Sequence, residues 1–404
     1  MKSVYYLANH PTDVVLYSDF CRFLHRHLPE VSQTLIVATH PYFRRFDCSS
    51  FFEMFDKVIN LPAAGYHVRP KAFFSNIGYK RRVARLDFND DSLVVTHALT
   101  HTELTINLLL RRIQQTTNGA RVLTLDVSPF YRTMPRPTRT NDWRARAGYA
   151  QAVALLGAYP MFGQFRTGQL VHQVYEHEET IIDQHVVLSD HFESCPDYVT
   201  VKHPINPAIP AENADVDERR IGSASSYVFF FGNQRIFDFY PEVSRDSLVN
   251  LTNTFLAKLT KLYANTGVRL LYKMHPFEMD QAILFDLSGF HRFDKPLSSE
   301  MIYSLYRERI RAVYSLGSTS ATTASLYGIP SFTFFEMLPF SPSTHALFER
   351  YLLSASRVVS VRGLNELKVE EPHPSVVFND NDAGHLLDVL CGRKSSSSLH
   401  GREI

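Results

Sequence analysis

Cysteine is scarce in this sequence, and several features that mark specialised classes of protein are missing. The four cysteines are far apart and show no CxxC spacing, which argues against a disulfide framework and against a zinc site. No apolar stretch approaches the ~18 residues of a membrane-spanning helix. With a net charge of only +1, the composition does not favour binding to nucleic acid. We therefore expect a globular protein of a reducing cytoplasm.

The 404 residues alternate between short apolar runs and helix-like stretches. This alternation is typical of parallel sheets that helices cover on both faces, and the length suggests two domains. The segment 206–225 is rich in proline, acidic and small residues and has no apolar periodicity, so it is the predicted linker. We predict an α/β fold of two Rossmann-like domains facing a central cleft. The domains are 1–205 and 226–391, and the polar tail 392–404 is expected to be disordered.

A His-Pro pair follows a predicted strand, "VRLLYKM" (268–274), which also carries Lys273. Pro276 lacks an N–H and ends the ladder, and it holds His275 in extended geometry. His275 is thus expected at the carboxyl end of a strand, where open α/β sheets bind ligands. The alternative is a strand terminator without a chemical role.

The segment "RAVYSLGSTSATTASLYGIP" (311–330) predicts a strand, a turn and a short helix from about residue 319 to 327. Ser318 and Thr319 occupy the positions of N-caps, with Ser315 and Ser320 nearby. A helix N-terminus of this kind is either a simple cap or a phosphate site, because it combines free N–H groups, hydroxyl donors and a positive dipole end. Its expected place on the sheet edge that carries the His-Pro pair favours the phosphate site.

A third loop is expected at the same edge. Gly232, Asn233 and Gln234 follow the predicted strand "SYVFFFG" (226–232) as it ends. No cluster of metal-binding residues is visible in the sequence, so neither a metal nor a separate cofactor is predicted.

This layout resembles the nucleotide domain of GT-B type glycosyltransferases, which have twin Rossmann domains and the same strand–loop–helix–"GIP"–strand unit. Many members that use UDP-sugars carry a glutamate on this helix for the ribose hydroxyls. Thr323 occupies that position here, and the helix contains no acid. The His-Pro pair followed by "YSLGS" is instead similar to bacterial sialyltransferases and polysialyltransferases of capsule and lipooligosaccharide synthesis.

The resemblance implies an inverting, metal-independent transfer from a CMP-activated sugar. His275 would support the departing phosphate by a hydrogen bond or as a general acid, because hydrogen-bond donors that point at a developing anion stabilise it. The donor substrate would contact residues of the three loops: Gly232, Asn233, Gln234, Lys273, Pro276, Ser315, Ser318, Thr319 and Ser320.

The resemblance also implies a base in the first domain that accepts the proton of the acceptor hydroxyl. Asp126 ends the predicted strand "RVLTLD" (121–126) and is the candidate base, although the second acid and the glycine of the related motif are missing. His97 and His101 in "THALTHTE" are rival bases or acceptor-binding residues. The same stretch is also explained as a capping box that starts a helix.

Arginine is concentrated in "FYRTMPRPTRTNDWRARAG" (130–148). Because guanidinium groups grip carboxylates with two hydrogen bonds, Arg132 and Arg136 are candidates for binding an anionic glycan acceptor. The alternatives are a solvated basic loop and a loop that rests on anionic lipid headgroups in a peripheral association with the inner membrane.

The sequence therefore predicts a transferase of sialic acid or a related nonulosonic acid to a surface glycan. We expect it to work at the cytoplasmic face of a bacterial membrane. One alternative is a CMP-Kdo transferase or a CDP-polyol phosphotransferase of capsule synthesis. An alternative from another class is a non-catalytic module that binds glycan or nucleotide on the same scaffold, which the incomplete acidic motif would favour.

Overall fold

The computed structural model of the chain describes residues 1–38, 46–62, 70–97, 104–127, 137–138, 165–166, 169–171, 183–189, 199–204, 226–234, 236, 240, 242–275, 278, 282–353, 357–370 and 378–393. No helix among them is long and apolar enough to cross a membrane.

The chain divides into two compact units, and unit 1 comprises Met1–Leu188, Ser194–Pro204 and Phe378–Ile404. Unit 1 contains a seven-stranded sheet in the order β10-β9-β5-β4-β1-β2-β3, and each pair of neighbouring strands is parallel. The strands are β1 (Ser3–Ala8), β2 (Ser32–Ala38), β3 (Lys57–Leu61), β4 (Ser92–His97), β5 (Arg121–Asp126), β9 (Gln184–Leu188) and β10 (Val199–Val201). A separate antiparallel sheet joins β6 (Pro137–Thr138), β7 (Phe165–Arg166) and β8 (Gln169–Val171).

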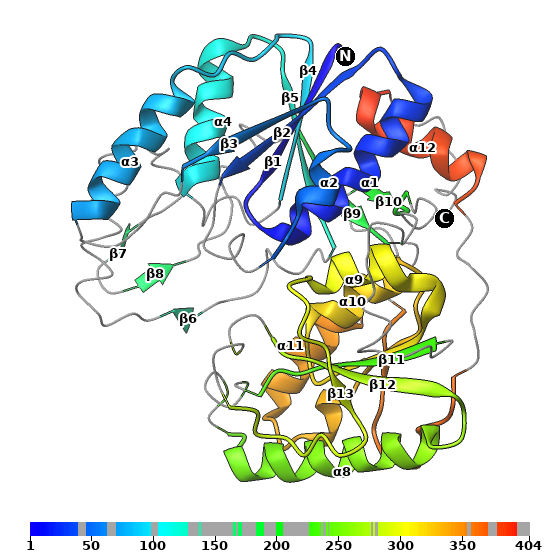
Figure 1. Cartoon of the computed structure of the whole chain (residues 1–404). Coiled ribbons are helices and arrows are strands. Elements are labelled where there is room, and N and C mark those ends of the chain that lie inside the picture. The colour runs from blue at the N-terminus through cyan, green and yellow to red at the C-terminus, as the bar shows by residue number, and fades with distance from the viewer. Residues whose placement is uncertain are drawn as a thin grey trace, which may run out of the picture. The chain divides into compact units, whose positions relative to one another are not determined.

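Helices cover both faces of the large sheet in unit 1 (Figure 1). These helices are α1 (Pro11–His27), α2 (Ser49–Phe52), α3 (Pro70–Val83) and α4 (Leu104–Thr116). Alternate residues of β1 point to opposite faces, as the period of a strand requires. Leu7 packs in a cluster with Tyr79 of α3 and Leu109 of α4, whereas the ring of Tyr6 lies 5.4 Å from that of Tyr17 on α1.

Unit 2 contains a six-stranded parallel sheet in the order β13-β12-β11-β14-β15-β16. The strands are β11 (Ser226–Phe231), β12 (Val268–Lys273), β13 (His291–Arg292), β14 (Ile310–Ser315), β15 (Ser331–Thr333) and β16 (Val359–Ser360). Its helices are α8 (Arg245–Tyr263), α9 (Ser299–Tyr306), α10 (Thr319–Leu326) and α11 (Pro342–Leu352), with 3-10 turns η7 (Arg307–Arg309) and η8 (Phe335–Met337).

The core of unit 2 also lies on both faces of its sheet. Phe230 packs with Phe255 of α8, whereas Phe229 belongs to the cluster that includes Tyr303 of α9 and Ala324 of α10. Strands buried on both faces explain the near-continuous apolar runs in the sequence. The predicted fold class of two Rossmann-like α/β domains is confirmed.

The last helix, α12 (Asp380–Cys391), corrects the predicted domain limits. Unit 1 comprises Met1–Leu188, Ser194–Pro204 and Phe378–Ile404, and unit 2 comprises Ser189–Glu193 and Ile205–Val377, so α12 does not belong to a domain 226–391. Arg121 donates hydrogen bonds to the carbonyls of Leu390 (3.1 Å) and Val389 (3.3 Å). A cation at the negative end of a helix dipole stabilises this docking. The predicted linker lies outside the described residues, and so does the predicted tail after its first two residues, Gly392 and Arg393.

We expect Gly384→Ala to stabilise unit 1 by about 1 kcal/mol. Gly384 lies inside α12, and a Cβ built there meets nothing within 4 Å, so alanine gains helix propensity at no steric cost. Gly392→Ala is the matched control. This residue has φ +72° and its Cβ would lie 2.6 Å from the guanidinium of Arg121, so we expect a loss of stability. Urea unfolding measures both changes, and a destabilised Gly384→Ala would contradict the helical packing described here.

Candidate functional site

The candidate site lies at the carboxyl edge of the sheet in unit 2. Phe231 at the end of β11 is in register with Lys273 of β12 on one side and with Ser315 of β14 on the other. The chain runs outward from β11 through β12 to β13 and then returns to β14, so the order reverses between β11 and β14. Parallel α/β sheets bind ligands at such a switch point, and the three predicted loops meet there.

His275 follows β12 in this edge. It is half-buried, and its carbonyl accepts a hydrogen bond from the N–H of Glu278 at 2.9 Å, which closes the turn after the strand. Burial lowers the pKa of His275 to about 4. The imidazole is therefore neutral at pH 7 in the free protein, and it can offer an N–H to an oxyanion without carrying a charge of its own. Pro276 lies outside the described residues.

Lys273 brings a buried positive charge to the same edge. Its side chain is 4% exposed, its Nζ donates to the carbonyl of Lys295 at 2.7 Å, and it lies 5.5 Å from the centre of the Phe293 ring. It forms no ion pair with any residue that the structure describes. Burial lowers its pKa to about 8, against the opposing effect of Asp294, so the ammonium is mostly charged at pH 7.

The buried ammonium of Lys273 gives a test by pH. Because its pKa is lower in the folded chain than in the unfolded chain, the unfolded state binds more protons between about pH 8 and 10.5. The free energy of unfolding therefore rises with pH through this window, and the buried lysine lowers it most below pH 8. We expect Lys273→Met to remove this rise, a difference of about 3 kcal/mol across the window. Urea unfolding of both proteins at pH 7 and pH 10 measures it, and parallel pH curves would contradict the burial of the charge.

The hydroxyl groups after β14 form a compact network. Ser318 is the N-cap of α10, and its Oγ accepts from the N–H of Ser320 at 3.2 Å and from the Ser320 hydroxyl at 2.9 Å. The N–H of Ser318 donates to the Oγ of Ser315 at 3.4 Å. Neither the N–H nor the hydroxyl of Thr319 bonds to another described residue, so both are available at the helix N-terminus.

Gly232 follows β11 and touches the next strand closely. Its N–H donates to the carbonyl of Lys273 at 2.9 Å, and a Cβ at this position would lie 2.7 Å from Cζ of Tyr272. Tyr272 is completely buried, and its hydroxyl has no hydrogen-bond partner among the described residues. Only glycine fits here. The sequence predicts Gly232 after the strand, but no pattern in it indicates this contact.

Gln234 has a structural explanation that differs from the predicted donor contact. It is fully buried, its Nε2 donates to the carbonyl of Ala282 at 3.0 Å, and its Oε1 accepts from the N–H of Leu284 at 2.9 Å. The side chain thus holds a neighbouring loop in place. Asn233 is half-buried beside it and remains the predicted polar donor contact of this turn.

Unit 1 has a corresponding switch point between β1 and β4. His97 ends β4 and is half-buried, and the pairing of Leu7 with Thr96 brings the end of β1 next to it. Asn9 follows β1 and is 5% exposed, and within the described part of the chain its Nδ2 has no hydrogen-bond partner. The backbone N–H groups of Asn9 and His10 both donate to Asp13 at 2.9 Å. Sequence reasoning missed Asn9, although "NHP" repeats the His-Pro signal.

Other predicted residues of the first domain are placed only in part. Asp126 ends β5, and because His97 is in register with Leu125, it lies on the strand next to β4 at the same edge. Nothing is described of its side chain. His101, Arg132 and Arg136 lie outside the described residues.

A third His-Pro pair is structural. His203 follows β10 and is 1% exposed, and its Nε2 lies 3.0 Å from Oδ2 of Asp19 on α1. This pair anchors the chain after β10 to a helix of the same unit, so His203 is not a further site residue.

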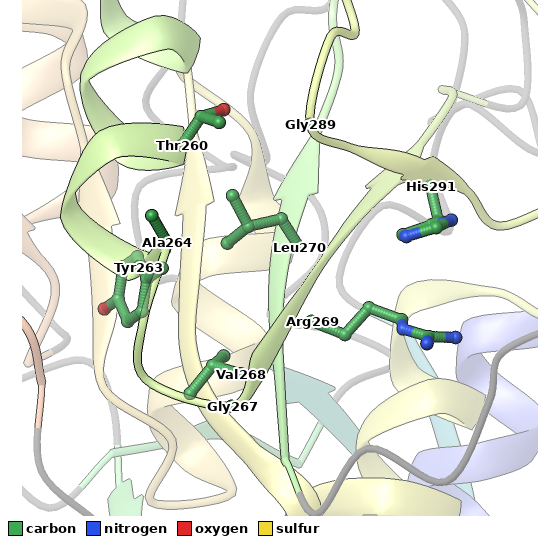
Figure 2. Close-up of a pocket in the computed structure, with 9 residues that line it drawn as sticks. All are labelled: Thr260, Tyr263, Ala264, Gly267, Val268, Arg269, Leu270, Gly289 and His291. Atoms are coloured by element: carbon green, nitrogen blue, oxygen red, sulfur yellow. The ribbon is translucent and has the colours of Figure 1, made fainter.

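A cavity of about 480 Å³ lies elsewhere in unit 2 (Figure 2). Its lining comes from the end of α8, the turn at Gly267, the start of β12 and His291 of β13. It is at the amino end of β12, and strand geometry puts that end roughly 17 Å from Lys273. Because parallel sheets bind ligands at the opposite edge, the cavity is separate from the candidate site.

Comparisons with known proteins show a similarity of structure only. No protein-family profile matches the sequence, and no curated protein matches it. The structure is similar to that of MnaA from S. aureus, solved with UDP, at 11% identity, covering 83% of this chain and 79% of that one with a TM-score of 0.42. It is also similar to the ADP-heptose LPS heptosyltransferase II of E. coli at 9% identity, covering 98% and 100% with a TM-score of 0.41.

A third similar structure is a glycosyl transferase family 9 protein from Veillonella parvula. Its identity is 12%, the coverage is 89% of this chain and 86% of that one, and the TM-score is 0.38. Likeness at this level carries no conclusion about activity.

Proposed function

We propose that this chain is a glycosyltransferase that moves a nonulosonic acid, such as sialic acid, from a CMP-activated donor to a glycan acceptor. The observation that supports it most is the carboxyl edge of the unit 2 sheet. A neutral His275, the charged Lys273 and the free N–H and hydroxyl of Thr319 belong to loops or strands that end there side by side. Donors fixed in a partly dry edge stabilise the phosphate that leaves.

The CMP donor is preferred over UDP-sugars because of α10. Thr323 stands where the resemblance predicts a ribose-binding glutamate, and it is 1% exposed. Its hydroxyl donates to the carbonyl of Thr319 at 3.1 Å, so it is used within the helix. A single phosphate also needs fewer positive groups than a diphosphate, and Lys273 is the one buried cation at this edge among the described residues.

Asp126 is the proposed base for the acceptor hydroxyl, with His97 as its rival on the neighbouring strand. The unpartnered Nδ2 of Asn9 at the same edge of unit 1 is a natural contact for an acceptor hydroxyl. Arg132 and Arg136 remain the proposed contacts for an anionic acceptor. The reaction needs no metal in this proposal, and no group of three or more metal-binding side chains occurs among the described residues.

Two other functions share this chemistry. A CMP-Kdo transferase or a CDP-polyol phosphotransferase would use the same phosphate contacts, and the choice of nucleotide and sugar separates them. A non-catalytic module would bind the nucleotide without transferring or hydrolysing the sugar. We place the enzyme in the cytoplasm, where CMP-sugars are used for surface glycans in the family that the sequence resembles.

The test is a comparison of melting temperatures with CMP, CDP, UDP and GDP on wild type, His275→Ala and His291→Ala. A ligand at ~100 times its dissociation constant adds about 2.7 kcal/mol, which gives a clear shift. We expect CMP to stabilise the wild type and the His291→Ala control, because His291 is exposed on β13, away from the site. His275→Ala should lose the response. A shift with UDP or GDP instead of CMP would overturn the proposed donor.

A further inference from the structure

Helix α3 of unit 1 carries a stripe of exposed side chains that the proposed reaction does not use. Phe74, Gly78, Arg81 and Arg85 are spaced four, three and four residues apart, so they share one face of α3 and of the turn that follows Val83, and Arg82 flanks this face beside Arg81. Phe74 is 70% exposed, the highest value among the large apolar side chains that the structure describes. The three arginines are exposed as well.

The opposite face of α3 fixes this orientation. Asn76, Tyr79 and Val83 are buried, and Tyr79 and Val83 pack in one cluster with Leu109 of α4. The Tyr79 hydroxyl donates to the carbonyl of Thr105 at 2.8 Å. In Figure 1, α3 lies beside α4 at the side of unit 1. The stripe therefore cannot turn inward to bury Phe74 without breaking the core.

The charge on this surface is positive and unbalanced. Lys80 is exposed about 100° around the helix from Arg81, and neither Lys80 nor Arg81, Arg82 or Arg85 forms an ion pair with a described residue. The nearby Asp87 forms an ion pair with Arg112 of α4 at 3.4 Å. The whole chain has 42 lysines and arginines against 41 acids, so this is a local excess and not a general one.

We propose that the α3 surface, defined as Phe74, Lys80, Arg81, Arg82 and Arg85, docks the protein on a bilayer that contains anionic phospholipid. An aromatic side chain that inserts at the interface, flanked by arginines that reach the headgroup phosphates, is the pattern of helices that lie on membranes. Gly78 presents no side chain beside Phe74, and a Cβ there would meet nothing within 4 Å, so the helix backbone can approach the lipid closely.

A bilayer explains this surface better than RNA or an acidic protein does. RNA binding uses several aromatic rings for stacking and a groove that follows the backbone. The α3 surface has a single exposed ring on the convex side of a helix. A flat sheet of anionic headgroups over an apolar layer matches both the charge and the phenylalanine.

This inference does not depend on the donor, because neither nucleotide nor acceptor takes part in its test. The full chain is sedimented with vesicles of phosphatidylcholine alone and with vesicles that also contain phosphatidylglycerol. We expect binding only to the anionic vesicles, with release at ~1 M salt, where screening is strong. Arg81→Gln/Arg82→Gln should weaken binding at least about tenfold, since each cation near an anionic surface contributes roughly fivefold. Phe74→Ser should weaken it without changing the salt dependence.

The matched control removes two exposed lysines from α8 in unit 2, as Lys258→Gln/Lys261→Gln. It changes the net charge by the same amount and should bind as the wild type does. The melting temperature of every variant shows that the fold is kept. Three results would overturn the proposal: no binding to anionic vesicles at low salt, an equal loss in the control, or binding to a homopolymer RNA that the α3 substitutions abolish while vesicle binding persists.

Discussion

His275→Ala is expected to lower the rate of sugar transfer about 10²–10³-fold, the usual loss when one donor to a developing oxyanion is removed. The burial that lowers the pKa of His275 to about 4 also keeps water away from the bond that it would make. The proposed role is a neutral N–H donor to the phosphate as it leaves. The measurement is the rate of CMP release from the donor that the melting experiments identify, with a saturating acceptor.

His275→Gln is the informative companion, because its amide retains an N–H donor but cannot titrate. We expect it to recover part of the lost rate and to remove the dependence on His275 protonation. A general acid would behave differently, since glutamine would then be no better than alanine. Equal rates for wild type and His275→Ala would place the phosphate elsewhere.

The same histidine should make the fold sensitive to acid. Its pKa is about 4 in the folded chain and near 6.5 when unfolded, so the unfolded state takes up the proton first. The free energy of unfolding is therefore highest above about pH 6.5, and it falls by up to about 3 kcal/mol as the pH falls toward 4. Wild type should lose stability relative to His275→Gln as the pH falls through this range, and a constant difference between their unfolding curves would contradict the burial.

The strands of unit 2 were predictable because they are short, apolar and buried on both faces. The predicted runs 226–232 and 268–274 and the strand expected at the start of 311–330 correspond to Ser226–Phe231, Val268–Lys273 and Ile310–Ser315. The helix that was expected from about residue 319 begins at Thr319, because Ser318 accepts the hydrogen bond of a cap. Local chemistry decides these elements, so the sequence reveals them.

The features that escaped prediction depend on contacts between distant residues. Helix α12 joins unit 1 through bonds from Arg121 to the carbonyls of Leu390 and Val389, and no periodicity records a pairing across some 269 positions. The use of Gln234 to hold the loop at Ala282 is hidden for the same reason. A polar residue after a strand predicts the edge of a sheet, but not whether its side chain faces a ligand or another loop.

Gly232→Ala is expected to destabilise unit 2 by about 1–3 kcal/mol, the usual cost of overpacking a core. The added Cβ would lie 2.7 Å from Cζ and 2.8 Å from Cε2 of Tyr272. That ring has little room to move, because it stacks on Phe230 with centres 6.0 Å apart and meets Phe285 edge-on at 6.4 Å. The clash is relieved only if the loop after β11 shifts, so the variant should also weaken the response to CMP. Urea unfolding and the melting experiment measure the two effects.

Tyr272→Phe tests whether Gly232→Ala destabilises the protein through its clash with Tyr272 or through the loss of glycine itself. The Tyr272 hydroxyl is buried and has no partner in the part of the chain that the structure describes, so its removal should be neutral or stabilise by about 1 kcal/mol. In the double variant, the space left by the oxygen accepts part of the new methyl group, and the cost of Gly232→Ala should fall by about 1 kcal/mol or more. Because the ring carbons stay close to the Cβ, the rescue is partial. If the two changes are simply additive, Tyr272 is not what requires glycine at the edge of the proposed donor site.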